Sequence, residues 1–279
     1  MSVRSARYNL LSLRNPKGLT VIPEERDAWA FLDAAAITSS REQRAVIDLV
    51  RGLKHAQLWS KMKAIYPFVG GTATTHKYNL KDPRDADAAF RLSFNGGMTH
   101  NSNGITGNGT NAYANTFRFA NDNTSTDWHR SLYSRTSTNT VAQVELGATD
   151  SPSGIFRSDA IGTRQPDGNA YLGSGAAPPN EWISFGNSNG SGHYINSRTA
   201  SNSAKAYKNG SVTQTSTATG LTLPGFNIFI MARNASGSLQ FPSTRNLAFA
   251  TIGDGLTDTD ATNLYNIVQR FQTSLGRQV

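Results

Sequence analysis

The spacing of apolar residues changes near residue 70, and this change restricts the folds that the chain can adopt. Between Pro23 and Ala64 apolar residues recur every three or four positions, which is the period of amphipathic helices. From about Asp82 onward they fall in short β-prone runs separated by stretches rich in Gly, Asn and Ser. Many short strands with no helical pattern between them predict a mainly β protein, an antiparallel sandwich or jelly roll, and not a parallel α/β sheet.

The β-prone runs define the expected strands. They cover residues 89–94, 113–119, 130–135, 141–146, 181–185, 193–198, 206–208, 211–216, 226–232 and 246–252. The polar stretch 99–111 contains three glycines and is expected to form a loop or the fringe of a sheet edge.

Helix-start signals mark the first quarter of the chain. Pro23 precedes a cluster of acidic residues, which complements the positive end of a helix dipole. Ser39 with Glu42, or Ser40 with Gln43, has the spacing of a capping box. A third short helix is expected over residues 57–65. These helices are too short to bury much surface alone, so we expect them to pack on a larger unit.

The chain closes with one more helix, expected over residues 258–275. Thr257 and Asp260 have the spacing of an N-cap and its partner, and Gly276 is a typical stop signal. The apolar face consists of Ala261, Leu264, Ile267, Val268, Phe271 and Leu275.

Positive charge is concentrated near the N-terminus. The formal net charge is +8, and residues 1–66 hold eleven Lys/Arg against six Asp/Glu, a net +5. A nucleic-acid surface would interleave such cations with aromatic residues, whereas the leader has only Tyr8. We therefore expect a docking arm over 1–22, carrying Arg4, Arg7, Arg14 and Lys17, a helical adaptor over 23–71, and a sandwich over 72–279, with no direct nucleic-acid partner.

Composition narrows the class of protein further. The chain has no cysteine, so disulfides, Cys-ligated metal centres and thiol nucleophiles are excluded. No apolar run reaches the roughly 18 residues of a membrane span, and the start lacks the apolar core of a signal peptide. We expect neither membrane insertion nor secretion.

Two segments resemble the concanavalin A-like, laminin-G-type sandwich family. The first is Tyr207-Lys208-Asn209-Gly210, similar to a Tyr-x-Asn-Gly hairpin of that family; Asn-Gly suits a two-residue turn that needs positive φ. The second is the strand over 246–252 followed by Leu256-Thr257-Asp258 and a helix with Leu264-Tyr265. The resemblance implies a jelly-roll sandwich.

A second resemblance, to virion proteins of tailed bacteriophages, is scattered over most of the chain. It rests on segments 28–36, 58–71, 76–83, 108–115, 133–136 and 271–279. Such proteins are tail, fibre or head-decoration components. The resemblance implies a structural or receptor-engaging part of a particle, with other virion proteins as partners and assembly in a host bacterial cytoplasm.

The acidic residues give no sign of a hydrolase. Retaining glycosidases need two carboxyl groups about 5–5.5 Å apart, yet the acids after residue 90 are dispersed, and Glu145 alternates with Gln143. The five histidines lack paired metal spacing. Asp127 and His129 share one strand face beside Trp128, which fits a surface polar pair better than a catalytic dyad. We expect no enzymatic activity and no cofactor.

Calcium remains open as an alternative. Residues 150–154 (Asp-Ser-Pro-Ser-Gly) and 253–255 (Gly-Asp-Gly) supply oxygen ligands in loops, although such loops are more often simple turns.

Receptor or glycan binding requires exposed aromatic residues near polar loops. The candidates are Trp128, Tyr133, Tyr171, Trp182 and Tyr194. Strand alternation should place about half of them in the core. Single glycan sites are often near millimolar, about −4 kcal/mol, so avidity would favour a homo-oligomer such as a trimer.

These observations predict a structural virion component that docks through its arm and helices and displays a sandwich for attachment to a host surface or glycan. A stand-alone lectin-like module and, less favoured, a glycan hydrolase are the alternatives.

Overall fold

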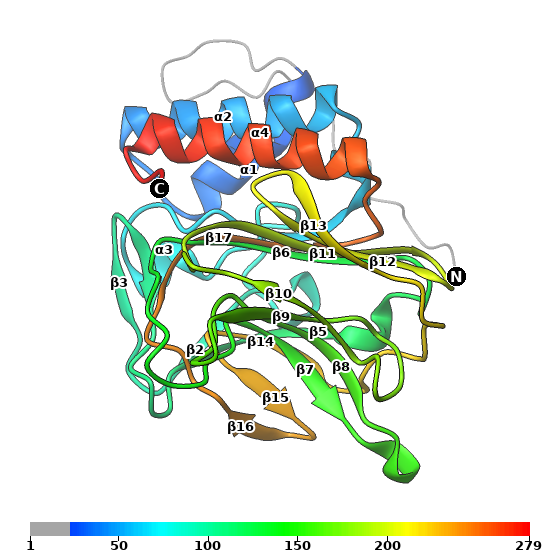
Figure 1. Ribbon diagram of the computed structural model, residues 1–279. Helices are drawn as coiled ribbons and strands as arrows, with labels where there is room; N and C mark the ends of the chain where they lie inside the picture. Colours follow the sequence, from blue (N-terminus) through cyan, green and yellow to red (C-terminus); the bar gives the residue numbers. More distant parts are fainter. Residues whose placement is uncertain (1–22) are drawn as a thin grey trace, which may run out of the picture.

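Two antiparallel sheets packed face to face form the body of the protein, and helices cover one of them (Figure 1). The structure, a computed structural model, describes residues 23–279. The predicted fold class is confirmed as a mainly β, antiparallel two-sheet sandwich with an N-terminal helical segment and a C-terminal helix. The arm with Arg4, Arg7, Arg14 and Lys17 lies outside the described residues.

The first sheet has the strand order β13-β12-β11-β6-β17-β4-β3, and β1 also pairs with β17. All its pairs are antiparallel. Asn209 and Gly210 turn β12 into β13 with φ of 50° and 78°, as the Asn-Gly signature predicted. Its strands are β1 (Met62–Tyr66), β3 (Thr99–Asn101), β4 (Gly104–Thr106), β6 (Trp128–Ser134), β11 (Gly192–Ala200), β12 (Ser203–Lys208), β13 (Ser211–Ser216) and β17 (Asn246–Gly253).

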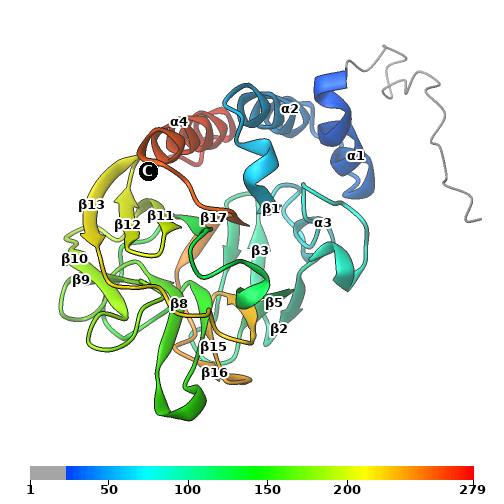
Figure 2. The same ribbon diagram turned by 90° about the vertical axis from the view of Figure 1, so that its right-hand side faces the viewer.

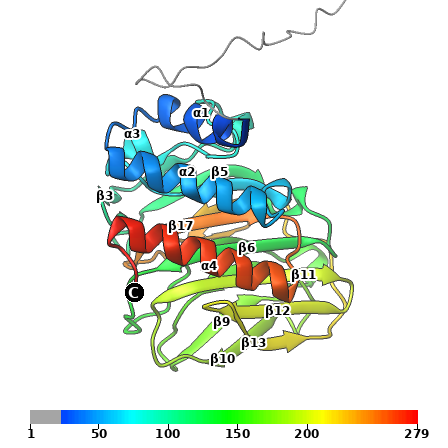
Figure 3. The same cartoon turned by 90° about the horizontal axis from the view of Figure 1, so that it is seen from above.

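The second sheet has the order β10-β9-β8-β7-β14-β5-β2, and the β15–β16 hairpin joins it at β7. The β15–β7 pair is parallel. The edge strands β13 and β10 lie at the same end of the sandwich (Figure 3). Its strands are β2 (Ser93–Asn95), β5 (Tyr113–Phe119), β7 (Leu146–Asp150), β8 (Arg157–Gly162), β9 (Asn169–Gly173), β10 (Trp182–Gly186), β14 (Asn227–Ile230), β15 (Arg233–Ala235) and β16 (Ser238–Gln240).

The helices begin and end where capping chemistry predicts. Ser39 Oγ accepts from the Glu42 N–H, and Thr257 and Asp260 form a complete capping box. Gly276, at φ 71°, ends the last helix. The α-helices are α1 (Arg26–Ala34), α2 (Ser40–His55), α3 (Ala73–His76) and α4 (Asp258–Leu275); the 3₁₀ turns are η1 (Pro23–Glu25), η2 (Trp59–Lys61), η3 (Asp87–Ala89), η4 (Ala120–Asp122) and η5 (Pro152–Gly154).

Two apolar cores result from this layering. One lies between the sheets and includes Leu132, Ile161 and Ile230. The other lies between the first sheet and the helices, where Phe249 of β17 meets Phe271 of α4 with ring centroids 5.9 Å apart. Figure 2 shows α1, α2 and α4 side by side over this sheet. The central strands of the first sheet, such as β6 and β11, are therefore covered on both faces, whereas the edge strand β13 is exposed.

Buried arginines tie loops to strands in this cysteine-free chain. Arg277, near the C-terminus, donates to the carbonyls of Pro67, Phe68 and Ala248 at 2.8–3.1 Å. Arg130 of β6 bridges the sheets to Asp159 of β8, with Nη2 2.7 Å from the carboxylate. A guanidinium offers five donors, so one side chain can hold several backbone segments.

The expected third helix is wrong. Within residues 57–65 the chain forms η2 and then β1, because Met62–Tyr66 pairs with β17 and the sheet contacts override the helical apolar spacing. The adaptor segment 23–71 thus includes a strand of the sandwich, and its role as a docking unit stays a prediction. Two strand expectations also shift: 141–146 lies mostly before β7, and 89–94 overlaps β2 only at its end. The stretch 99–111, expected as a loop or the fringe of a sheet edge, contains β3 and β4 at the edge of the first sheet.

Across residues 23–279, no helix is long and apolar enough to cross a membrane.

Candidate functional site

The second sheet turns part of its outer face to solvent. On β9, Ala170 and Leu172 point into the core, whereas Tyr171 between them is half-exposed on the other face. On β10, Ile183 is buried and its neighbours Trp182 and Ser184 face outward. Because successive strand residues alternate between faces, the sheet places Tyr171 and Trp182 on one open surface.

Three aromatic rings meet on this surface. The Trp182 ring lies 6.3 Å from Tyr171, edge to face at 90°, and 6.3 Å from Phe156, tilted by 42°. Edge-to-face pairs at this distance are favourable beyond the area they bury. We call Phe156, Tyr171 and Trp182 the aromatic cluster.

Asp167 fixes the polar end of the cluster. Its carboxylate accepts a 2.6 Å hydrogen bond from the Tyr171 hydroxyl and another from the Asn169 N–H at 2.9 Å. The Tyr171 hydrogen bond lowers the pKa of Asp167, and the same bond raises the pKa of Tyr171. The tyrosine ring is therefore held in one orientation.

A polar groove of about 290 Å³ runs beside Trp182, between the edge strands β10 and β13 of the two sheets. We call it the edge groove. Its lining contains no charged side chain, and the Thr215 N–H is held by the neighbouring Gln214 Oε1 at 3.1 Å. The lining consists of Asn180, Trp182, Ile183, Ser184, Gln214, Thr215, Ser216, Thr217 and Ala218.

Arg198 holds both walls of the edge groove from inside. It is fully buried, and its Nη2 donates to the Ser174 carbonyl at 2.7 Å and to the Ala218 carbonyl at 3.1 Å. Ser174 begins the loop that leads into β10, and Ala218 follows β13. Arg198 is thus a positioning residue that sets the distance between the two edges.

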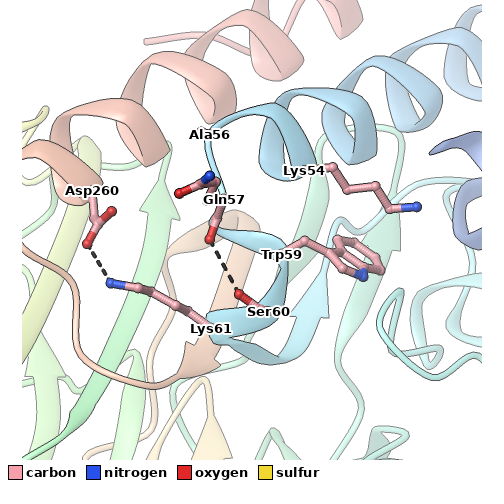
Figure 4. Close-up of a pocket in the computed structure, with 7 residues that line it drawn as sticks. All are labelled: Lys54, Ala56, Gln57, Trp59, Ser60, Lys61 and Asp260. Carbon is pink, nitrogen blue, oxygen red and sulfur yellow. Dashed lines mark hydrogen bonds and ion pairs between the residues drawn. The ribbon is translucent and has the colours of Figure 1, made fainter.

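A second, larger groove of about 630 Å³ lies between the end of α2, η2 and the start of α4 (Figure 4). We call it the helix groove. Its cations are already paired: Lys61 lies 2.7 Å from Asp260, and Lys54 lies 2.7 Å from Asp27. Lys54 and Lys81 also stack on Trp59, at 5.5 and 4.2 Å from the ring centroid. These contacts join the helices to the sandwich.

For three of the five residues, the predicted contact with a glycan or receptor is wrong, because their side chains are not accessible. Trp128, Tyr133 and Tyr194 are 0% exposed, because the sheet that carries them is covered on both faces. Tyr171 and Trp182 remain accessible, and the structure brings these two together.

Two fully buried carboxylates are engaged by arginines. Asp159 pairs with Arg130, and Glu145 pairs with Arg245. Asp127 accepts from the Gly255 N–H at 2.6 Å, while His129 is fully buried and contacts the Asp254 carbonyl and Thr251. The expected surface pair of Asp127 and His129 is therefore wrong, because His129 lies in the interior.

The two candidate calcium loops are also neutralised internally. Asp150 forms a two-pronged ion pair with Arg157, and Asp254 lies 2.7 Å from Lys63. Within residues 23–279, no group of three or more His, Asp or Glu is arranged to hold a metal ion. The carboxylates of both loops are thus engaged by side chains of the protein itself.

Known proteins are similar to this chain in fold. No protein-family model matches the sequence, and no curated protein matches it. A mutant of Trypanosoma rangeli sialidase displaying trans-sialidase activity aligns with 82% of this chain at 13% identity and a TM-score of 0.50; the chain spans 39% of that protein. Its similarity supports the β-sandwich fold alone.

Two further solved structures align less closely. Domain 4 of AbnA, an extracellular GH43 arabinanase from Geobacillus stearothermophilus solved with arabinotriose, has a TM-score of 0.49 at 16% identity, covering 74% of this chain and 98% of that domain. The botulinum neurotoxin serotype D binding domain has a TM-score of 0.47 at 10% identity, covering 75% of this chain and 52% of that one.

Sequence reasoning missed Phe156, Arg198 and the β13 wall of the edge groove. Strands β8 and β9 are short and contain Asp or Gly, so their sequences do not show a strand pattern. The position of Phe156 next to these strands could therefore not be predicted. The uncharged stretch 211–219 could have indicated the β13 wall, because an edge strand without Lys or Pro leaves its backbone groups open to another molecule.

Proposed function

We propose that this protein is a non-enzymatic attachment module that binds glycan through the aromatic cluster and the edge groove. The observation that carries the proposal is the position of Trp182, which belongs to both features. Binding sites for small ligands combine aromatic surface with a few placed polar groups. A sugar ring would stack on Trp182 while its hydroxyls reach Asn180, Ser184 and Gln214.

The edge groove supports binding without bond cleavage. Hydrolysis by the common glycosidase mechanisms needs two carboxyl groups flanking the scissile bond. The residues that line the groove include neither Asp nor Glu. Asp167, beside the cluster, already accepts hydrogen bonds from Tyr171 and Asn169.

The module would act as a structural component of a tailed-bacteriophage virion. This part of the proposal rests on the sequence resemblance and on the layout of the chain. Helix α1, next to the basic N-terminal segment, lies at the end of the molecule opposite β10 and β13 (Figures 2 and 3). A subunit that docks by its N-terminal part would thus present the edge groove outward, and several copies would raise the avidity of a weak site.

Two experiments test the proposal. In the first, the full chain and its Trp182→Ala variant are compared on an array of immobilised glycans; retention that depends on Trp182 supports glycan binding, and its absence on every glycan contradicts it.

In the second experiment, residues 1–20 are deleted. The virion role predicts that the truncated protein folds but is not incorporated into particles, whereas normal incorporation would contradict the docking arm.

A further inference from the structure

We infer that the glycan bound at Trp182 is uncharged. This inference rests on the proposed function and concerns the ligand class of the same site. It follows from which charges the edge groove lacks, which charges lie beside it, and which hydrogen-bonding groups it offers.

Among residues 23–279, those that line the edge groove offer no cation to an anionic sugar. Its lining contains no Lys or Arg. The guanidinium behind it, Arg198, is buried and already donates to the carbonyls of Ser174, Ala200, Ser201 and Ala218. A carboxylate or sulfate that lost water in this groove would gain no ionic partner, which is costly.

Two carboxylates lie next to the aromatic cluster, one in sequence and one by a hydrogen bond. Glu181 directly precedes Trp182, and its Oε2 is buried without a hydrogen-bond partner. Asp167 lies at the other end of the aromatic cluster, on Tyr171. The cation next to the cluster in the chain, Arg157, is already paired with Asp150. A uronic acid, sialic acid or sulfated sugar would therefore meet carboxylates and no unpaired partner among these residues.

The groups that the groove does offer match hydroxyls. A hydroxyl both donates and accepts, and so do the side chains of Asn180, Ser184 and Gln214. The Thr215 N–H, on the β13 edge, is now bonded to Gln214 Oε1. A sugar hydroxyl can replace that side chain and accept from the edge strand, because edge strands carry backbone groups without a strand partner.

The helix groove provides a matched control on the same molecule. It also contains a half-exposed tryptophan, Trp59, but this ring is flanked by Lys54 and Lys81. A charged polymer attracted to this basic protein would respond to salt. A neutral glycan bound at Trp182 would not.

Affinity electrophoresis of the full chain tests the inference, with dextran, mannan, galactan and arabinan as uncharged probes and polygalacturonate and polysialic acid as anionic probes. We expect retardation by at least one uncharged polymer, unchanged by salt. Trp182→Ala should weaken it about tenfold or more, whereas Trp59→Ala should leave it unchanged.

The possible results separate the two levels of the proposal. Trp182-dependent retardation by anionic polymers alone, lost at high salt, would overturn the uncharged ligand while glycan binding stands. No Trp182-dependent retardation by any polymer would contradict glycan binding itself. Circular dichroism of both variants checks that each remains folded.

Discussion

The two sheets of the sandwich differ in how they are covered. In the first sheet every residue of β6 is buried, as are residues 192–198 of β11, because helices cover the face that the second sheet does not. In the second sheet β9 and β10 alternate between buried and accessible residues. The second sheet is equally buried along β7 and nearly all of β8, so its open face is limited to the end formed by β9 and β10. A ligand can bind at this end.

The two grooves repeat this contrast. The helix groove is lined by lysines that are paired with Asp27 and Asp260, so its polar groups already serve the joint between helices and sheet. The edge groove is neutral, and Asn180, Ser184 and Gln214 line it. Volume alone does not identify the binding site, because the larger helix groove is the one whose charged side chains are already paired within the protein.

The largest effect is expected where charge is buried between the sheets. Arg130→Ala should lower the free energy of unfolding by about 3–5 kcal/mol, because it leaves the Asp159 carboxylate buried without its cation. The matched control is Lys205→Ala, whose ion pair with Asp258 is partly exposed and should contribute about 1 kcal/mol or less. Chemical denaturation of both variants measures the difference; equal losses would contradict the distinction.

Loss of the helical cover should come next. Leu264 of α4 is 0% exposed in the core between helices and first sheet, so Leu264→Ala should cost about 2–5 kcal/mol. The solvent-facing Asn266 of the same helix gives the control Asn266→Ala, expected within about 0.5 kcal/mol of the parent. If both variants unfold at the same denaturant concentration, α4 does not support the sheet as described.

Acid should weaken the covered sheet. Burial lowers the pKa of His129 to about 4 and that of His193 to about 3, against 6.5 for a free histidine. Between pH 6.5 and about 4 the unfolded chain binds protons that the folded chain does not, so the free energy of unfolding falls as the pH falls. The expected slope is about 1.4 kcal/mol per pH unit for each histidine.

Denaturation curves measured from pH 7 to pH 4 check this slope. The variant His193→Phe removes one buried titrating group and should reduce the slope. An unchanged slope in this variant would show that His193 titrates alike in both states.

The smallest effect on stability and the largest on binding should fall on the open face. Trp182 is partly exposed, so Trp182→Ala should change the free energy of unfolding by about 1 kcal/mol while weakening glycan binding about tenfold or more. Phe156→Ala, which removes a ring that Trp182 contacts, should weaken binding less. A Trp182→Ala variant that unfolds before it can be assayed would place this residue in the structural core instead.

The sequence predicted local structure, such as caps and turns, better than it predicted which side chains are exposed. The capping box at Thr257 and the Asn209-Gly210 turn depend on neighbours in the chain, and both formed as expected. Residues 62–66 carry a helical apolar spacing but pair with β17, a partner far along the chain. Only this tertiary contact decides whether residues 62–66 form a helix or a strand.

Exposure could not be predicted for the same reason. In the sequence, the strands of Trp128, Tyr133 and Tyr194 mix polar and apolar residues as those of Tyr171 and Trp182 do, yet all three side chains are buried. Tyr133 is buried by the helices that pack over the first sheet, whereas Trp128 and Tyr194 lie in the core between the two sheets. No local pattern shows either packing. The edge groove likewise joins residues near 182 and 215, brought together by the meeting of two sheet edges.

The most direct test of the account is the indole NMR spectrum of the full chain, because its four tryptophans report on different environments. Trp128 is buried, Trp29 donates to Glu25, and Trp59 lies under lysines. Addition of an uncharged glycan is predicted to shift the Trp182 signal and leave the other three in place. A shift of Trp59 in place of Trp182, or no shift with any glycan, would contradict binding at the open sheet.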